Sequence, residues 1–364
     1  MSVWRILLRM PWHILFLAGV LVLVGALALY SASQGAWQPW AGRHVVRAAI
    51  GMVLALVIAF VDFGFIRRMS YLFLLGAILL LASLMVIGSG NGVARWISLG
   101  GFNLQPSEPA KIAVILALAR YFDSQPHERM NSIAVYLPAL AMIAVPFLLV
   151  LKQPDLGTAL MLLFGGVVIV FAAGLPWRFV VGALVIAAAA VPALWSLLHD
   201  YQKARVFTFL NPESDILGAG YQITQSKIAL GSGGFFGKGF LMGSQSQLNY
   251  LPEKQTDFVF TMIGEEFGFA GNIFILTVYL LISLSILHIS YRVKSRFAQL
   301  SCMGIAMMLF FYMFVNVAMV TGLLPVVGAP LPLISYGGTA MLTVFIAFGI
   351  VASAAIHDRR DQQV

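Results

Sequence analysis

The chain has 364 residues, of which 60% are hydrophobic and only 10% are charged. A soluble domain carries roughly 25% charged residues, so this composition excludes a water-soluble globule and indicates an integral membrane protein. The single cysteine, Cys302, lies in an apolar stretch, which excludes a disulfide framework and a cysteine-based metal site. The formal net charge is +8, but no basic block has nucleic-acid-binding character, so no nucleic-acid partner is expected.

Ten stretches approach the length of about 20 apolar residues that crosses a bilayer. The first follows Arg5 and Arg9 and resembles a secretory signal, but many further apolar stretches follow it, so we interpret it as a membrane span. The predicted fold is therefore all-α, with one polytopic membrane domain over residues 1–364. The spans are expected near residues 13–30, 44–61, 70–88, 107–121, 133–151, 156–174, 178–198, 262–288, 299–321 and 338–356.

The basic residues beside these spans predict the orientation of the chain. Ten spans place both termini on one side, and most basic residues of the short connections fall on that side. The positive-inside rule then predicts cytoplasmic termini and an outward-facing loop, residues 199–256, between the seventh and eighth spans. The basic residues on the predicted cytoplasmic side are Arg5, Arg9, Arg67, Arg68, Arg120, Arg129, Arg178, Arg292, Lys294, Arg296, Arg359 and Arg360.

The fourth span begins with a pair of opposite charges. Glu108 and Lys111 are three residues apart and share one helix face, and Ser107 or Glu108 is suited to cap a helix that begins near Pro109. Ionisable side chains next to hydrocarbon are costly and point to function, but a structural ion pair explains them equally well. The sequence leaves both interpretations open.

Two further polar groups lie on the predicted outer side. Asp155 follows a proline at the start of the sixth span, where a helix N-cap is the simpler interpretation and a functional carboxylate the alternative. Arg95 stands beside Trp96, a pairing typical of an interfacial anchor.

The long loop contains a short helix and a false nucleotide motif. Residues 222–230 show the spacing of an amphipathic helix. Gly237 and Lys238 suggest a phosphate-binding loop, but Ser232 and Gly239 occupy positions where that motif needs glycine and a hydroxyl, which excludes it.

The loop ends in a polar segment against the eighth span. Asp257 is suited to cap the following helix, but it also has Glu253 and Lys254 close by and bulky Phe258 and Phe260 after it. A carboxylate at an apolar boundary is where the pKa of a general base is tuned. We therefore predict that Asp257 is a catalytic base.

Motifs along almost the whole chain resemble the SEDS family (shape, elongation, division and sporulation), and within it the elongation members. The motifs are Gly92-Val-Ala-Arg-Trp-Ile-Ser-Leu-Gly100, Gln105-Pro-Ser-Glu-Pro-Ala-Lys111, Gln153-Pro-Asp-Leu-Gly-Thr158, Gly243-Ser-Gln-Ser-Gln-Leu248, Leu251-Pro-Glu-Lys-Gln-Thr-Asp-Phe258 and Pro325-Val-Val-Gly-Ala-Pro-Leu-Pro-Leu-Ile-Ser-Tyr-Gly-Gly338. The resemblance implies that Asp257 is the family's essential loop aspartate. It further implies that Lys111, Glu108 and Asp155 line the cavity beside it and that Arg95, Arg205 and Lys227 are further polar site positions. Gln255 departs from the pattern, because members often carry histidine there.

The resemblance also implies the activity and the partners. Family members are glycosyltransferases that polymerise lipid II into glycan strands, with undecaprenyl diphosphate as leaving group, on the outer face of the bacterial cell membrane. The implied partners are lipid II, the nascent lipid-linked glycan, a single-span class B penicillin-binding protein with transpeptidase activity, and other elongation-complex proteins. A lipid II flippase is the alternative function. The outer carboxylates permit a divalent cation without specifying one, so cofactors stay open.

Overall fold

The computed structural model is mostly helical. It describes residues 3–87, 95–99, 102–197, 203, 207–209, 211, 218–248, 250–251 and 253–358. Each of the ten predicted apolar stretches falls on a helix, within a few residues at most ends. These helices are α2 (Trp12–Ala32), α3 (Ala41–Phe60), α4 (Phe63–Ile87), α5 (Ser107–Asp123), α6 (Tyr136–Lys152), α7 (Leu156–Ala172), α8 (Trp177–Leu197), α12 (Val259–Arg292), α13 (Arg296–Val320) and α14 (Gly338–His357).

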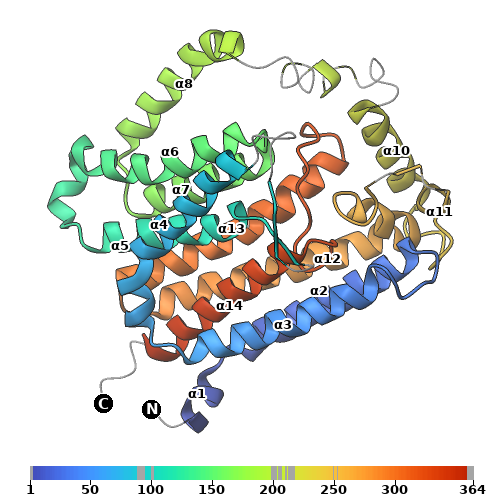
Figure 1. The fold of residues 1–364 in the computed structure, drawn as a ribbon, viewed down its shortest axis with the longest axis horizontal. Coiled ribbons are helices and arrows are strands. Elements are labelled where there is room, and N and C mark those ends of the chain that lie inside the picture. Colours follow the sequence, from blue (N-terminus) through green and yellow to red (C-terminus); the bar gives the residue numbers. More distant parts are fainter. Residues whose placement is uncertain are drawn as a thin grey trace.

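The helices pack as a bundle around α5 and α13. Helix α5 contacts α4, α6, α7, α13 and α14, while α13 also packs on α12 and α7. On the other side, α14 packs on α3, and α2 packs between α3 and α12. Figure 1 shows α2, α3, α12, α13 and α14 running in nearly the same direction, with α8 at the edge of the molecule.

Length and composition make this helical chain a multi-pass membrane protein. Within the described residues, seven helical segments are long and apolar enough to cross a bilayer. Helix α7 and the apolar part of α8 are shorter. Helix α5 has only 17 residues and carries charges, but most of its side chains are buried by neighbouring helices, so it need not match lipid. The seven segments are Trp12–Ala32, Ala41–Phe60, Phe63–Met85, Ile133–Lys152, Val259–Arg292, Arg296–Val320 and Gly338–His357.

Short elements connect the long helices. A two-stranded antiparallel hairpin, β1 (Ile97–Leu99) and β2 (Phe102–Leu104), precedes α5 and pairs Ser98 with Asn103. The sequence predicted an all-α chain and missed this hairpin, because three-residue strands are too short to show a period. The remaining helices are α1 (Val3–Arg9), the 3-10 turns η2 (His127–Asn131) and η3 (Ile133–Val135), α10 (Ala219–Ser232) and α11 (Ser244–Gln247).

Helix α10 contains the amphipathic helix predicted for residues 222–230. Ile223 is buried, whereas Lys227 is exposed. The hydroxyl of Ser226 lies 2.7 Å from Thr261 Oγ1 of α12 and donates to the carbonyl of Val320 at the end of α13, also at 2.7 Å. These bonds fix α10 against the two helices that carry the candidate site.

Candidate active site

The start of α5 carries two buried charges that neutralise each other. Lys111 Nζ lies 2.7 Å from Glu108 Oε1, and only 2% and 3% of the two side-chain surfaces are exposed. Tyr312 of α13 completes the group, because its hydroxyl accepts from Lys111 and donates to Glu108 Oε2. A buried ion pair is stable only when further hydrogen bonds satisfy its atoms, and the tyrosine supplies them.

The helix cap predicted at Ser107 or Glu108 is wrong. Helix α5 begins at Ser107, two residues earlier than expected, and its N-cap is Pro106 without a side-chain hydrogen bond. Both candidate caps therefore lie inside the first turn, and the Glu108 carboxylate is engaged by Lys111 and Tyr312 instead.

Asp155 caps α7, as one of its two predicted interpretations proposed. Its Oδ1 accepts from the Thr158 backbone at 3.1 Å and its Oδ2 from the Thr158 hydroxyl at 2.9 Å. Oδ2 also accepts from Gln105 Nε2 at 3.1 Å, which joins the start of α7 to the segment before α5. Next to it, a Cβ on Gly157 would lie 2.7 Å from the Val327 carbonyl, so the segment 325–337 can approach closely only because residue 157 is glycine.

Asp257 is positioned through its backbone. Asn316 of α13 donates from Nδ2 to the Asp257 carbonyl at 2.8 Å, and Ser335 donates to the Thr256 carbonyl at 2.6 Å. The alternative of a helix cap is not realised, because α12 begins at Val259 and neither Thr256 nor Asp257 caps it.

One face of α13 brings Asp257 and the buried ion pair together. Tyr312, which contacts Glu108 and Lys111, is four residues before Asn316, which holds the Asp257 carbonyl. Side chains four apart on a helix are neighbours, with Cβ atoms about 5–6 Å apart. The predicted residues of α5 and of the long loop therefore meet at one place.

The Asp257 carboxylate lies in surroundings that oppose its charge. Partial burial, followed by the nearby carboxylates of Glu253 and Asp155, raises the pKa of Asp257 from 3.8 to about 6. Gly328, with φ of +72°, lies against this carboxylate, since a Cβ there would be 3.4 Å from Asp257 Oδ2. An acid with a pKa near 6 is poised to exchange protons close to neutral pH.

Arg95 supports the turn before Asp155. It donates from Nε to the Gln153 carbonyl at 3.1 Å and from Nη2 to the Pro154 carbonyl at 2.6 Å. Arg95, predicted as an interfacial anchor, therefore stabilises the backbone turn that precedes Asp155.

The other predicted site residues are placed less directly. Lys227 is exposed on α10 and lies against Gly322. Glu253 is exposed and accepts from the Thr256 hydroxyl at 3.0 Å, while Lys254 is buried and burial lowers the pKa of its ammonium group. Arg205 lies outside the described residues.

A metal site does not emerge among the described side chains, where no three His, Cys, Asp or Glu residues group closely enough to hold an ion. The sequence did not predict Tyr312, Asn316 and Ser335 as residues of the site. Asn316 had a signal, since a polar residue within an apolar span is costly and usually functional. Tyr312 had none, because its partners lie about two hundred residues away in the chain.

The family model of the FtsW, RodA and SpoVE cell cycle proteins matches residues 5–360. The chain belongs to this family. The family resemblance drawn from the sequence motifs is confirmed.

Individual relatives match this chain over nearly its whole length. The peptidoglycan glycosyltransferase MrdB (RodA) of Escherichia coli K12 is 43% identical over 352 residues, covering 95% of this chain and 93% of that protein. A probable peptidoglycan glycosyltransferase FtsW of Trichlorobacter lovleyi is 37% identical and covers 95% and 94%.

Solved structures share the fold of this family member. A chain from a peptidoglycan synthase complex that coordinates polymerization and crosslinking superposes with a TM-score of 0.82 at 32% identity, covering 95% of this chain and 97% of that one. The rod-shape-determining protein RodA of Thermus thermophilus gives a TM-score of 0.71 at 30% identity, covering 97% and 98%.

Proposed function

We propose that this family member is a peptidoglycan glycosyltransferase that polymerises lipid II into glycan strands during cell elongation. The observation that carries the proposal is the carboxylate of Asp257, whose raised pKa suits a base and whose backbone is held by Asn316, one helical turn from Tyr312 of the buried Glu108–Lys111–Tyr312 group. Support for the activity comes from the 43% identity to the glycosyltransferase MrdB over 95% of the chain.

Asp257 is the base in this reaction. The 4-hydroxyl of an N-acetylglucosamine on lipid II attacks the anomeric carbon of the N-acetylmuramic acid at the end of the lipid-linked strand, with inversion from α to β. The carboxylate takes the hydroxyl proton, and undecaprenyl diphosphate leaves with the electron pair of the broken bond. General base catalysis of this kind contributes about 10²–10⁴-fold.

Lys111 stabilises charge that develops on the leaving diphosphate. Its ammonium group has three donors, and Glu108 and Tyr312 engage two of them. The third has no partner among the residues that the structure describes and can reach a substrate oxygen, while the two partners hold the ammonium in position before the reaction begins. Asp155 and Arg95 shape the neighbouring turn, and Lys227, Arg205, Glu253 and Lys254 are further substrate contacts.

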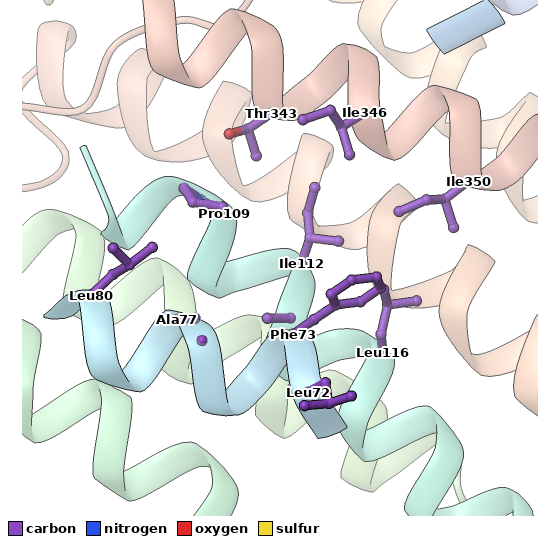
Figure 2. A pocket seen from close by; sticks show the side chains of 12 residues that line it. Leu72, Phe73, Ala77, Leu80, Pro109, Ile112, Leu116, Thr343, Ile346 and Ile350 are labelled. Atoms are coloured by element: carbon purple, nitrogen blue, oxygen red, sulfur yellow. The ribbon is translucent and has the colours of Figure 1, made fainter. Parts of the chain in front are cut away.

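An apolar groove supplies a place for a polyprenyl chain. It has a volume of about 340 Å³ and lies between α4, α5 and α14, and Figure 2 shows their side chains lining it. Pro109 stands at one end, directly beside Glu108. A hydrocarbon chain that enters there leaves its diphosphate next to Lys111.

The orientation and the partner complete the proposal. Ten spans, cytoplasmic termini and an outward-facing loop would place Asp257 on the outer side of the inner membrane, where lipid-linked precursors are polymerised. The partner is a single-span class B penicillin-binding protein that packs against exposed apolar side chains of α12 and α13, such as Leu284 and Phe314. The similarity to a chain of a peptidoglycan synthase complex supports such a partner.

The test is polymerisation of lipid II by the purified protein with its partner. Asp257→Asn is expected to lower the initial rate by about 10²-fold or more, since it removes the proton acceptor and keeps the side-chain shape. Glu128→Gln is the matched control, because Glu128 is an exposed carboxylate near the far end of α5 and its loss should leave the rate unchanged. Normal glycan chains from the Asp257 variant would exclude it as the base.

The same preparation distinguishes the flippase alternative. In sealed vesicles, movement of lipid II between the leaflets without glycan formation would support a flippase and contradict the proposal. Glycan formed from lipid II already present on the outer leaflet requires no transport and supports the glycosyltransferase.

A further inference from the structure

The walls of the apolar groove continue into two arginines. On α4 the lining residues Leu72, Gly76 and Leu80 follow at intervals of four, and Arg68 is the next residue of that row. On α5, the lining residues Ile112 and Leu116 lead in the same way to Arg120. Residues four apart lie on the same helix face, so both arginines stand at the end of the groove opposite Pro109.

A polar hollow lies at that end. It has a volume of about 510 Å³ and is lined by Gly64, Arg67, Arg68, Tyr71, Arg120 and Ser124. The α5 row that begins at Glu108 and ends at Arg120 spans twelve residues, or about 18 Å of helix. The hollow is therefore a separate place from the candidate active site.

Two positive charges in this hollow lack a carboxylate partner. Arg67 forms an ion pair with Asp123 at 2.5 Å. Arg120 instead stacks over Tyr71, 4.3 Å from the ring centroid, and donates to the Arg68 carbonyl at 2.7 Å. Neither Arg68 nor Arg120 forms an ion pair within the part of the chain that the structure describes.

We infer that the arginine hollow and the end of the groove that adjoins it bind an anionic phospholipid, while the Pro109 end stays available to the polyprenyl chain of the proposed substrate. Its phosphate contacts the guanidinium groups of Arg68 and Arg120, and one acyl chain lies between α4 and α5. An acidic peptide would satisfy the charges but has no acyl chain to contact Leu72 and Leu116, the apolar residues next to the arginines. The hollow lies where α4 begins and α5 ends, and basic pockets between helices at such positions suit lipid headgroups.

Charge alone does not account for this arrangement. A general excess of arginine on one side of a membrane protein orients the chain, but it does not require two helices to direct arginines into one hollow. Nor does it require a tyrosine ring to hold one of them in place. The combination of a cationic end and an apolar groove matches an amphiphilic ligand.

The test is lipid binding to the purified full-length chain in detergent, measured by native mass spectrometry. Palmitoyl-oleoyl phosphatidylglycerol is titrated against phosphatidylcholine with the same chains. The double variant Arg68→Gln/Arg120→Gln is expected to lower the affinity for phosphatidylglycerol by about tenfold or more and to leave phosphatidylcholine unchanged. The matched control is Arg292→Gln/Lys294→Gln, which removes the same charge at the end of α12, near Arg296 whose guanidinium reaches the Gln125 carbonyl just beyond α5.

A second variant tests the groove and guards against misfolding. Gly76 lines the groove and no other atom lies within 4 Å of its Cβ position, so Gly76→Leu directs bulk into the groove and should also weaken phosphatidylglycerol binding. Equal losses in the Arg292/Lys294 control would overturn the inference, as would unchanged binding in the Arg68/Arg120 variant. Displacement of the lipid by millimolar inorganic phosphate, together with no effect of Gly76→Leu, would assign the hollow to free phosphate. None of these readouts depends on glycan synthesis, so their failure leaves the glycosyltransferase proposal untouched.

Discussion

The carboxylate of Asp257 accepts no hydrogen bond from any side chain or backbone group that the structure describes, although its backbone is firmly held. The carbonyls of Gln255, Thr256 and Asp257 accept from Tyr336 N, Ser335 and Asn316 respectively. Three bonds to consecutive residues fix where the carboxylate stands without occupying its oxygens. A base positioned this way can accept a proton from substrate, because no internal partner competes for its lone pairs.

The raised pKa of Asp257 predicts a pH dependence. The base works as a carboxylate, so the protonated form that predominates below pH 6 is inactive. The initial rate of lipid II polymerisation should therefore rise between pH 5 and pH 7, with a midpoint near 6, and level off above it. Glu253→Gln removes one negative charge that raises this pKa and should move the midpoint to lower pH. A midpoint that does not respond to Glu253→Gln would contradict the assignment.

The contacts of Tyr312 predict that its hydroxyl is needed for activity as well as for stability. Tyr312→Phe removes the hydroxyl shared by Lys111 and Glu108 and leaves both with an unmade bond, at a cost of about 1–2 kcal/mol in the free energy of unfolding. Tyr136→Phe is the control, because its buried hydroxyl donates to the Met130 carbonyl away from the site. Both variants should lower the thermal unfolding midpoint, but only Tyr312→Phe should also slow polymerisation. Equal rates in the two variants would make Tyr312 merely structural.

The sequence predicted the roles of single site residues better than it predicted which residues contact each other. Asp155 as a cap follows from local pattern, because an aspartate after proline at the start of a helix bonds to the backbone three residues on. Asp257 as a cap failed because tertiary bonds to Asn316 and Ser335 decide how that segment enters α12. No local rule contains those contacts.

At the scale of elements, the long loop supplies hydrogen bonds to α12 where that helix is kinked. Gly268 has φ of +69° and ψ of −163°, so the helix is kinked there and loses internal hydrogen bonds. Residues 234–239 supply replacements: Lys238 N and Gly239 N donate to the carbonyls of Glu265 and Glu266, and Phe269 N and Ala270 N donate to those of Gly234 and Phe235. Buried backbone groups need such partners, so loop and kink stabilise each other.

Gly268→Ala should separate the loop from the helix. An added Cβ would lie 2.4 Å from Gly237 N, and the backbone conformation alone, which is essentially restricted to glycine, costs another residue about 1–3 kcal/mol. We expect a lower thermal midpoint and faster proteolysis within residues 233–248. Gly19→Ala in α2 is the control, since its Cβ position is open and alanine favours the helix. An unchanged digestion pattern for Gly268→Ala would show that the loop does not depend on the kink.

The elements themselves were largely predictable from the sequence. Long apolar stretches form helices because hydrocarbon leaves no other partner for the backbone, and the ten long helices follow the predicted ranges within a few residues at most ends. The kink in α12 was not predicted, because one glycine in a helical pattern does not reveal that a distant loop will bond there. The hairpin before α5 was not predicted, because its strands of three residues each are too short to show an alternating pattern.

At the scale of the whole molecule, the candidate site lies at one end of the helix bundle. Glu108 and Lys111 lie near the start of α5, Asp155 caps α7, and Asp257 precedes α12. The site is therefore formed by the N-terminal ends of three helices at one end of the bundle. Arg67 and Arg120 line the hollow at the opposite end, where Arg67 also pairs with Asp123 and Arg296 donates to the Gln125 carbonyl. In the proposed orientation, a lipid-linked substrate whose diphosphate lies in the headgroup layer would reach such a site without crossing the hydrocarbon.

Cysteine labelling tests the proposed orientation. The native Cys302 is buried and should not react, so single cysteines can be introduced without removing it. Ala36→Cys lies in the connection between α2 and α3, and Ser132→Cys lies between η2 and η3, both at exposed positions. In intact spheroplasts a membrane-impermeant maleimide should label Ala36→Cys at once and Ser132→Cys only after permeabilisation. The reverse pattern would invert the molecule and place Asp257 in the cytoplasm, and labelling of both cysteines before permeabilisation would contradict the number of spans between them.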